Sequence, residues 1–389
     1  MRYIFLPVMS TTMSLRRERA IANMERQRKE KTLRITTVPK YLRFNLAPTY
    51  SLFMPMSGAK IANQFAIVKR LLKCRYMPNI IGGTSGGCVV ATTMIGLGIA
   101  EIKSEQDYLQ FCAKLTLVLN DLDSTWYCTP HSYCQLFCTF RALQTGYLFD
   151  RGKGEEYIKK YAIDVINQPE TWLGTYDQTS SRHQLWCTKH KRDAIIRMKD
   201  ANYLDENVEQ IAKVAIASSA VPFIVPPIEI KGSTGAVKSQ CDGGVGFASP
   251  LGSLMPAFDA NQLTYHVVYI SPVRYSSKDD PEDDEIEDDD VWNKIRSSST
   301  GLVTGLHLPD RNNGIRAVGP KEKVHRETGE GERDLMHALE VQRTATRSFI
   351  EVTPRNATHL NFLTIKKGDA TKSVELAYRR GFTVRHWYI

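Results

Sequence analysis

The chain has 389 residues, of which 42% are hydrophobic and 24% are charged, and its formal net charge is +9. Length and composition are those of a soluble globular protein, with material for one large domain or two ordinary ones. No apolar run reaches the roughly 20 residues that span a bilayer, so we expect no transmembrane segment and only peripheral membrane contact.

The eight cysteines are spread irregularly and mostly lie inside apolar segments. Arg2 is followed by only a short apolar stretch that Pro7 interrupts, which does not match a secretory signal peptide. We therefore expect reduced thiols in an intracellular protein that is cytoplasmic or peripherally attached to a membrane.

Charge is distributed unevenly along the chain. Residues 276–292 contain ten carboxylates, and setting these aside raises the net charge of the rest from +9 to about +19. We expect 276–292 to be an acidic mobile loop and the folded body to favour anionic surfaces. Residues 1–46 form a basic extension with eight cations between Arg16 and Arg34. We expect a solvated, partly disordered arm there; attachment to acidic lipid or nucleic acid is the alternative.

The first folded elements are predicted from the apolar pattern. Residues 50–56 indicate a core strand, and 57–59 a turn. Residues 59–73 carry apolar side chains at the period of a core-facing helix. A short apolar run at 79–81 indicates a buried strand, and 88–97 a buried helix. This order predicts a βαβ unit with parallel strands.

Between that second strand and helix lies Gly83-Thr84-Ser85-Gly86-Gly87, a G-x-S-x-G pattern. In a strand-to-helix context this pattern predicts a nucleophile elbow, in which the serine adopts a strained backbone and its neighbours must lack Cβ atoms. The alternative is a glycine-rich turn with an idle serine. Because only one strand–helix unit precedes the elbow, the sequence does not favour a conventional α/β-hydrolase.

The rest of the chain gives coarser predictions. Residues 101–160 are expected to be mostly helical. Further predicted elements are helices at 207–217, 335–350 and 371–380 and strands at 263–270 and 359–365. Residues 310–333 are expected to be a second polar loop. Cys128, His131, Cys134 and Cys138 fit no standard zinc spacing unless Cys187 and His190 supply further ligands, so we predict packed thiols and no metal.

Three motifs in this order resemble the patatin-like phospholipases, a family of lipid acyl hydrolases. They are a glycine turn before a helix at 57–60, the pattern around Ser85, and Ser218-Ser219-Ala220-x-Pro222 leading to Asp242-Gly243-Gly244. The resemblance covers roughly residues 49–255. It implies a patatin-like three-layer α/β fold, with a mainly parallel central sheet flanked by helices. We expect a catalytic domain at 47–275 that is completed by 293–389.

The resemblance further implies a Ser–Asp dyad without histidine or cofactor. Ser85 would be the nucleophile and Asp242 the base that accepts its proton. Gly83, Gly87, Gly243 and Gly244 would shape the backbone around the two side chains. The substrate implied is a phospholipid or an acylglycerol.

The chain departs from the family at the oxyanion loop, where Met56, Ser57 and Ile61 stand in place of glycines while Gly58 and Lys60 are kept. Backbone N–H groups of Gly58, Ala59 and Gly86 are the expected oxyanion donors, since any residue except proline has one. The altered loop leaves open a catalytically impaired lipid-binding or scaffold protein.

Two other functions remain as alternatives. A Ser-His-Asp esterase would use one of five histidines: His266, His307, His325, His337 or His359. A nucleic-acid role depends on the basic extension alone and is the least favoured, because that segment lacks the interleaved aromatic residues of a single-strand binding platform.

Overall fold

The computed structural model describes two long stretches, 76–126 and 165–232, and several shorter ones. The shorter stretches are 33–35, 50–73, 128–129, 143–161, 235–245, 251, 254, 266–270, 348–354, 366–380 and 382–387. The predicted acidic loop at 276–292, the polar segment 310–333 and the strand expected at 359–365 lie outside these residues, as does nearly all of the basic extension.

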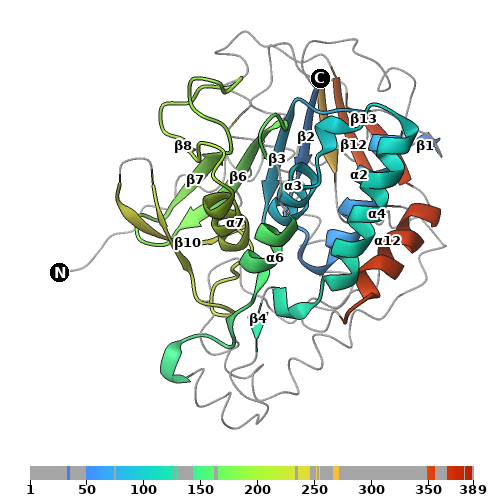
Figure 1. The fold of residues 1–389 in the computed structure, drawn as a ribbon. Coiled ribbons are helices and arrows are strands. Elements are labelled where there is room, and N and C mark those ends of the chain that lie inside the picture. Colours follow the sequence, from blue (N-terminus) through green and yellow to red (C-terminus); the bar gives the residue numbers. More distant parts are fainter. Residues whose placement is uncertain are drawn as a thin grey trace, which may run out of the picture.

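One large sheet organises the described residues (Figure 1). Its central strands are neighbours in the order β12, β11, β2, β3 and β6, and each pairs in parallel with the next. The bounds are β12 (Ser348–Pro354), β11 (His266–Ile270), β2 (Tyr50–Met54), β3 (Ile80–Thr84) and β6 (Glu170–Asp177). The prediction of a mainly parallel central sheet is confirmed.

Antiparallel strands extend the sheet on both sides. On one side, β13 (Phe382–Trp387) pairs with β12, and β1 (Leu33–Ile35) pairs with β13 at the edge. On the other side, β10 (Val237–Asp242) pairs with β6, and β9 (Ile228–Lys231) pairs with β10. A branch from β6 adds β7 (Arg182–Cys187) and β8 (Asn202–Tyr203). A separate two-stranded antiparallel sheet pairs β4 (Cys128–Thr129) with β5 (Asp150–Arg151).

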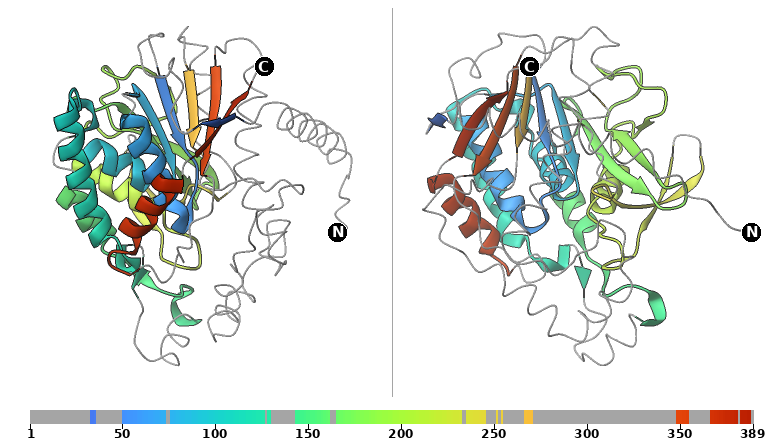
Figure 2. Two further views of the ribbon diagram at one scale, coloured as in Figure 1. Left: turned by 90° about the vertical axis from the view of Figure 1, so that its right-hand side faces the viewer. Right: turned by 180° about the vertical axis from the view of Figure 1, so that it is seen from behind.

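The described helices pack on one face of this sheet, as the view from the side shows (Figure 2). They are α2 (Ile61–Lys73), α3 (Gly86–Gly96), α4 (Glu105–Asp121), α6 (Gly154–Tyr161), α7 (Val208–Ala217) and α12 (Asp369–Arg380). Alternate strand residues face them: Leu52, Ile81 and Leu173 join the large apolar cluster that these helices cover. The alternation follows from the two-residue repeat of a strand.

The opposite face carries a second apolar cluster. It contains strand residues that neighbour members of the first cluster in the sequence, namely Phe53, Ile80 and Trp172, and they pack with Ile196 and Leu251. Both faces are therefore buried, as expected for parallel strands. The segment that contains Ile196 is held to the sheet by Glu170, which accepts hydrogen bonds from the Ile196 N–H (3.1 Å) and the Trp172 indole (2.7 Å).

The local predictions near the elbow are confirmed within a few residues. The expected strands at 50–56 and 79–81 are β2 and β3, and the helix expected at 59–73 is α2, preceded by a single 3-10 turn at Gly58–Lys60. The helices expected at 207–217 and 371–380 are α7 and α12, and the strand at 263–270 is β11.

One predicted helix is partly wrong. Residues 348–350, placed at the end of a helix at 335–350, belong to β12, and the rest of that segment lies outside the described residues. Phe349, Ile350, Val352 and Thr353 are β-branched or aromatic residue types, which favour a strand, and the backbone of this segment pairs with β11 and β13. The expectation of mostly helix at 101–160 holds for α4 and α6, but β4 and β5 were not predicted.

Candidate active site

Strand β6 brings Ser85 and Asp242 together. Because β7 pairs along one edge of β6, β3 and β10 must share the other edge. Thr84, the last residue of β3, lies opposite Gly174, and Asp242, the last residue of β10, lies opposite Thr175. The two strands run toward each other along that edge, so their final residues meet, and Ser85 directly follows Thr84.

Ser85 stands on a strained turn between β3 and α3. Its backbone has φ 55° and ψ −127°, outside the regions that residues with a Cβ ordinarily occupy. The flanking glycines are required by close packing: a Cβ on Gly87 would lie 2.1 Å from the Met54 carbonyl oxygen, and one on Gly83 would lie 2.6 Å from the Gly87 carbonyl oxygen. The elbow therefore fits tightly against the end of β2.

The two buried side chains of the predicted dyad are in direct contact. Ser85 Oγ donates a hydrogen bond to Asp242 Oδ2 at 2.7 Å. The other carboxylate oxygen accepts the Gly244 N–H at 2.7 Å. Ser85 is 5% exposed and Asp242 3% exposed, so bulk water does not compete for this contact.

Burial also changes the acidity of the aspartate. Loss of hydration raises the pKa of Asp242 from its ordinary value of 3.8 to about 6, while the hydrogen bonds from Ser85 and Gly244 act in the opposite direction. The carboxyl group is still ionised at neutral pH, but it is a stronger base than an exposed aspartate. This combination suits a group that must accept a proton from a hydroxyl.

Ser218 holds the elbow in place, a role that the sequence did not reveal. The Ser85 N–H donates to Ser218 Oγ at 2.8 Å, and Ser218 Oγ donates to the Gly174 carbonyl at 2.5 Å. Ser219 Oγ donates to the Ser85 carbonyl at 3.2 Å. Since its own N–H is used in this way, Ser85 does not offer that group to a substrate. The Ser-Ser-Ala motif was visible in the sequence, but its hydrogen-bond partners were not.

The same turn after α7 fixes the aspartate. The Asp242 N–H donates to the Ala220 carbonyl at 2.9 Å, and the Gly243 N–H donates to the Ser218 carbonyl at 3.3 Å. A Cβ on Gly243 would lie 2.2 Å from the Gly174 carbonyl oxygen, so only glycine fits there. The residues after α7 thus position both members of the dyad.

The predicted oxyanion donors lie beside the elbow. Gly58 begins the 3-10 turn with φ 49°, and the Lys60 N–H closes this turn on the Ser57 carbonyl at 2.9 Å; Ala59 lies between them. A Cβ on Gly86 would lie 3.4 Å from the Gly58 nitrogen, so the turn meets the first residue of α3. As the first residue of that helix, Gly86 has an N–H without an intrahelical acceptor.

Met56, two positions before Gly58, reaches the aspartate side of the site. A Cβ on Gly244 would lie 2.4 Å from the Met56 methyl carbon and 3.0 Å from Asp242 Oδ1. The thioether therefore lies against the backbone next to the carboxylate.

His266, the one candidate for a triad that lies among the described residues, does not support it. His266 is the first residue of β11 and pairs with Tyr50, the first residue of β2, so it lies at the starting edge of the parallel strands. Ser85 follows the last residue of β3, at the opposite edge. Five residues of strand at roughly 3.3 Å each separate the two levels by about 16 Å. The other four candidates, His307, His325, His337 and His359, lie outside the described residues.

Within the described part of the chain, no group of three metal-ligating side chains is present. His131, Cys134 and Cys138 lie outside that part, so the predicted absence of a metal there stays a prediction. Cys187 is a free, buried thiol in β7. None of the described helices combines the length and the apolar character needed to cross a bilayer.

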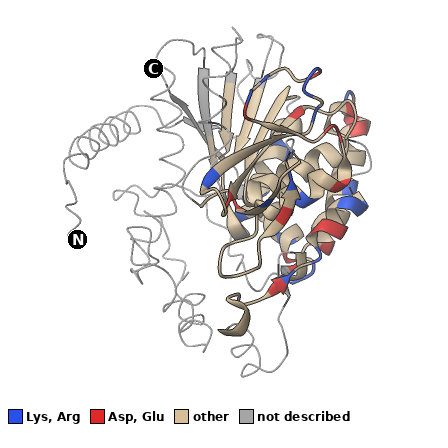
Figure 3. Ribbon diagram, turned by 90° about the vertical axis from the view of Figure 1, so that its left-hand side faces the viewer, with Lys and Arg blue, Asp and Glu red and all other residues tan. Residues whose placement is uncertain are grey.

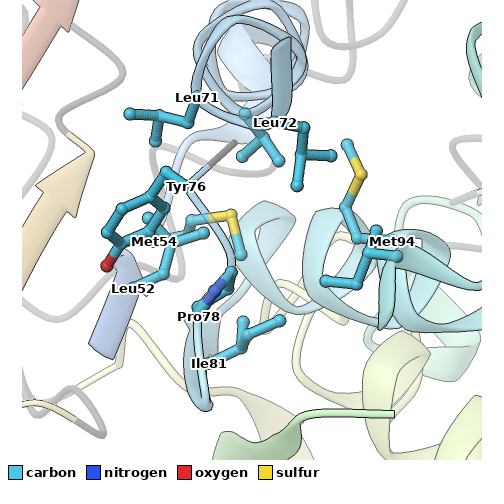
Figure 4. A pocket seen from close by; sticks show the side chains of 10 residues that line it. Leu52, Met54, Leu71, Leu72, Tyr76, Pro78, Ile81 and Met94 are labelled. Atoms are coloured by element: carbon cyan, nitrogen blue, oxygen red, sulfur yellow. The ribbon is translucent and has the colours of Figure 1, made fainter. Parts of the chain in front are cut away.

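A gap in the large apolar cluster is not a substrate site. It lies between α2 and strands β2 and β3, where Leu52, Met54 and Ile81 face Leu71 and Leu72 (Figure 4). It leaves no room for a water molecule. The hydroxyl of neighbouring Tyr76 is already bonded to the Ser51 carbonyl at 3.1 Å. The gap is a feature of core packing.

Comparison with known proteins gives one family match. A family model described as patatin-like phospholipase matches residues 58–255, just over half of the chain. The comparison with curated proteins finds no match. Among solved structures, the crystal structure of VipD from Legionella pneumophila aligns at 10% identity and a TM-score of 0.32, covering 89% of this chain and 66% of that one. The chain therefore spans slightly less than two thirds of VipD, and a similarity of this size supports no statement about activity.

Proposed function

The chain belongs to the patatin-like phospholipase family, and from this premise we propose that it hydrolyses ester bonds of phospholipids or acylglycerols with a Ser85–Asp242 dyad. The observation that supports the dyad best is the 2.7 Å hydrogen bond between these two side chains, which are 157 positions apart in the sequence and both buried. A serine hydroxyl is a weak nucleophile at neutral pH and needs such a base beside it.

In the acylation step, Ser85 Oγ attacks the ester carbonyl carbon while its proton passes to Asp242. The backbone N–H groups of Gly58, Ala59 and Gly86 receive the negative charge that develops on the carbonyl oxygen. The intermediate then releases the alcohol, which takes up the proton from Asp242. An acyl group remains on Ser85.

In the deacylation step, water takes the place of the alcohol. Asp242 accepts a proton from this water as its oxygen attacks the acyl carbon, and the fatty acid leaves as Ser85 regains its proton. The raised pKa of Asp242 favours both transfers, because it brings the basicity of the carboxylate closer to the working pH.

We propose a peripheral membrane contact that depends on charge. On the described helices, basic and acidic residues are interspersed (Figure 3), and pairs such as Lys69–Glu375 at 2.7 Å partly neutralise them. The concentrated positive charge of the sequence is instead the group of eight cations between Arg16 and Arg34. Each basic residue near an anionic membrane contributes roughly 1 kcal/mol.

The altered oxyanion loop favours one second candidate, a lipid-binding protein with little or no turnover. Met56 and Ser57 are bulkier than the family's glycines, and loss of a single oxyanion donor costs about 10² to 10³ in rate. The two candidates differ in one measurable property, which is the release of fatty acid from bound lipid.

The test uses vesicles of phosphatidylcholine with 20% or so phosphatidylserine, together with an acylglycerol emulsion, and measures fatty acid release by the purified full-length chain. We expect release by the wild type and none by Ser85→Ala or Asp242→Asn. Vesicle binding by all three without release by the wild type would favour the non-catalytic candidate. Full activity in either variant would refute the dyad.

A further inference from the structure

Ser57 carries a buried hydroxyl for which the structure gives no partner. Its Oγ is inaccessible to solvent and makes no hydrogen bond to any described residue. Leaving a buried hydroxyl without a partner costs on the order of 1–3 kcal/mol. Other buried groups, such as Ser51 Oγ, also lack a partner among the described residues, so the location of the Ser57 hydroxyl decides what it can do.

The hydroxyl lies at the oxyanion side of the elbow. A Cβ built on Gly86 would lie 2.4 Å from Ser57 Oγ, which is closer than its distance to Gly58 nitrogen, 3.4 Å. The Oγ therefore touches the backbone of the residue that follows the nucleophile. It also lies next to two of the proposed N–H donors, those of Gly58 and Gly86.

Local structure does not account for this orientation. Ser57 is the N-cap residue of the 3-10 turn Gly58–Lys60, a position where a serine side chain ordinarily accepts a backbone N–H. Here the side chain makes no such bond. The hydroxyl is turned toward the first residue of α3 instead of toward its own turn.

We propose that the Ser57 hydroxyl is a catalytic oxyanion donor, which supplements the backbone N–H groups of the altered loop. The inference rests on the proposed function and adds a residue to it. As Ser85 Oγ bonds to the carbonyl carbon and its proton passes to Asp242, the carbonyl π pair moves to the oxygen. The Ser57 O–H donates a hydrogen bond to that oxygen and keeps its own proton. When the pair returns, the bond to the alcohol oxygen breaks, and this oxygen takes the proton from Asp242.

This arrangement stabilises the transition state selectively. The hydroxyl has no partner among the described residues, so its bond forms when negative charge develops on the substrate. Only interactions that are stronger in the transition state than in the ground state accelerate a reaction. The replacement of glycine by serine at 57 then keeps the backbone N–H and adds a hydroxyl donor.

The experiment measures the rate constant for phosphonylation of Ser85 by a fluorophosphonate. In this reaction the Ser85 oxygen bonds to phosphorus, its proton passes to Asp242 and fluoride leaves. The phosphoryl oxygen occupies the oxyanion position, so the rate depends on the donors there. The variants are Ser57→Ala, which removes the hydroxyl, and Ser57→Thr, which keeps it. Ser51→Ala is the matched control, because Ser51 Oγ is also buried without a partner among the described residues but lies in β2, near the start of the strand. Thermal unfolding of each variant is measured in parallel.

We expect Ser57→Ala to slow phosphonylation about 10²-fold, the usual effect of losing one oxyanion donor. Ser51→Ala should stay near the wild-type rate, and Ser57→Thr should recover most of the rate that Ser57→Ala loses. Equal rates for Ser57→Ala and Ser51→Ala would overturn the inference and leave the dyad intact, as would an equal loss in Ser57→Ala and Ser57→Thr without unfolding. A wild type that the probe does not label would overturn the proposed function, and this inference with it.

Discussion

Replacing Ser218 with alanine should destabilise the protein and disable Ser85, although Ser218 does not take part in the chemistry. The substitution removes the oxygen that accepts the Ser85 N–H at 2.8 Å and donates to the Gly174 carbonyl at 2.5 Å. A buried N–H without an acceptor costs about 1–3 kcal/mol, and the lost bond to the carbonyl about 0.5–1.5 kcal/mol. We therefore expect the free energy of unfolding to fall by about 2–4 kcal/mol.

Ser219→Ala is the matched control for this prediction. Its hydroxyl donates to the carbonyls of Ser85 and Ala215, both at 3.2 Å. The Ser85 carbonyl keeps the Cys88 N–H at 2.9 Å, so no buried N–H loses its acceptor. The expected loss for this variant is about 1 kcal/mol.

Urea unfolding and the rate of fluorophosphonate labelling are measured on both variants. Ser218→Ala should unfold at a lower urea concentration than Ser219→Ala. Its labelling should also be slower, because the strained backbone at Ser85, with φ 55°, is no longer held. Equal unfolding midpoints together with wild-type labelling of Ser218→Ala would refute the reasoning.

Three further predictions concern the aspartate and its surroundings. Hydrolysis should fall as the pH drops below about 6, because Asp242 is then protonated. The free energy of unfolding of the wild type should decrease as the pH rises from 3.8 to about 6, because the carboxyl group ionises more readily in the unfolded chain than in the buried site. Asp242→Asn should avoid this loss and be up to about 3 kcal/mol more stable than the wild type at pH 8, measured by urea unfolding. Gly243→Ala should abolish activity and lower the unfolding temperature, because its Cβ meets the Gly174 carbonyl oxygen of the backbone at 2.2 Å. A Cβ on Gly244 meets side-chain atoms instead, the Met56 methyl carbon at 2.4 Å and Asp242 Oδ1 at 3.0 Å, so Gly244→Ala should lower the unfolding temperature less; an equal fall would contradict this. Met56→Ala should admit water to Asp242, lower its pKa and move the acid limb of the pH–rate profile to lower pH; an unchanged profile would show that the thioether does not dehydrate the base.

The β2–α2–β3 unit and the elbow could be predicted because their determinants are local. The apolar period of residues 61–73 and the glycines on either side of Ser85 are both visible in the sequence. The glycine spacing reports close backbone contacts, which the structure shows as 2.1 Å for a Cβ on Gly87 and 2.6 Å for one on Gly83. Such contacts depend on a few neighbouring residues.

Asp242 is different, because an aspartate followed by two glycines ordinarily indicates a turn. Its pairing with Ser85 was predicted only through the family resemblance. The physical reason for the pairing is the shared edge of β6, and that edge depends on which strands neighbour one another in the sheet. The hydroxyl network of Ser218 is equally non-local, so neither could be derived from spacing.

The central claim is that Ser85 is a nucleophile activated by Asp242, and its most direct test is mass spectrometry of the purified chain after reaction with a fluorophosphonate. We predict one phosphonyl adduct on Ser85 in the wild type, none in Ser85→Ala, and labelling slowed at least about 10²-fold in Asp242→Asn, the lower end of the rate that a positioned base contributes. An adduct at another serine, or an Asp242→Asn variant labelled as fast as the wild type, would contradict the account.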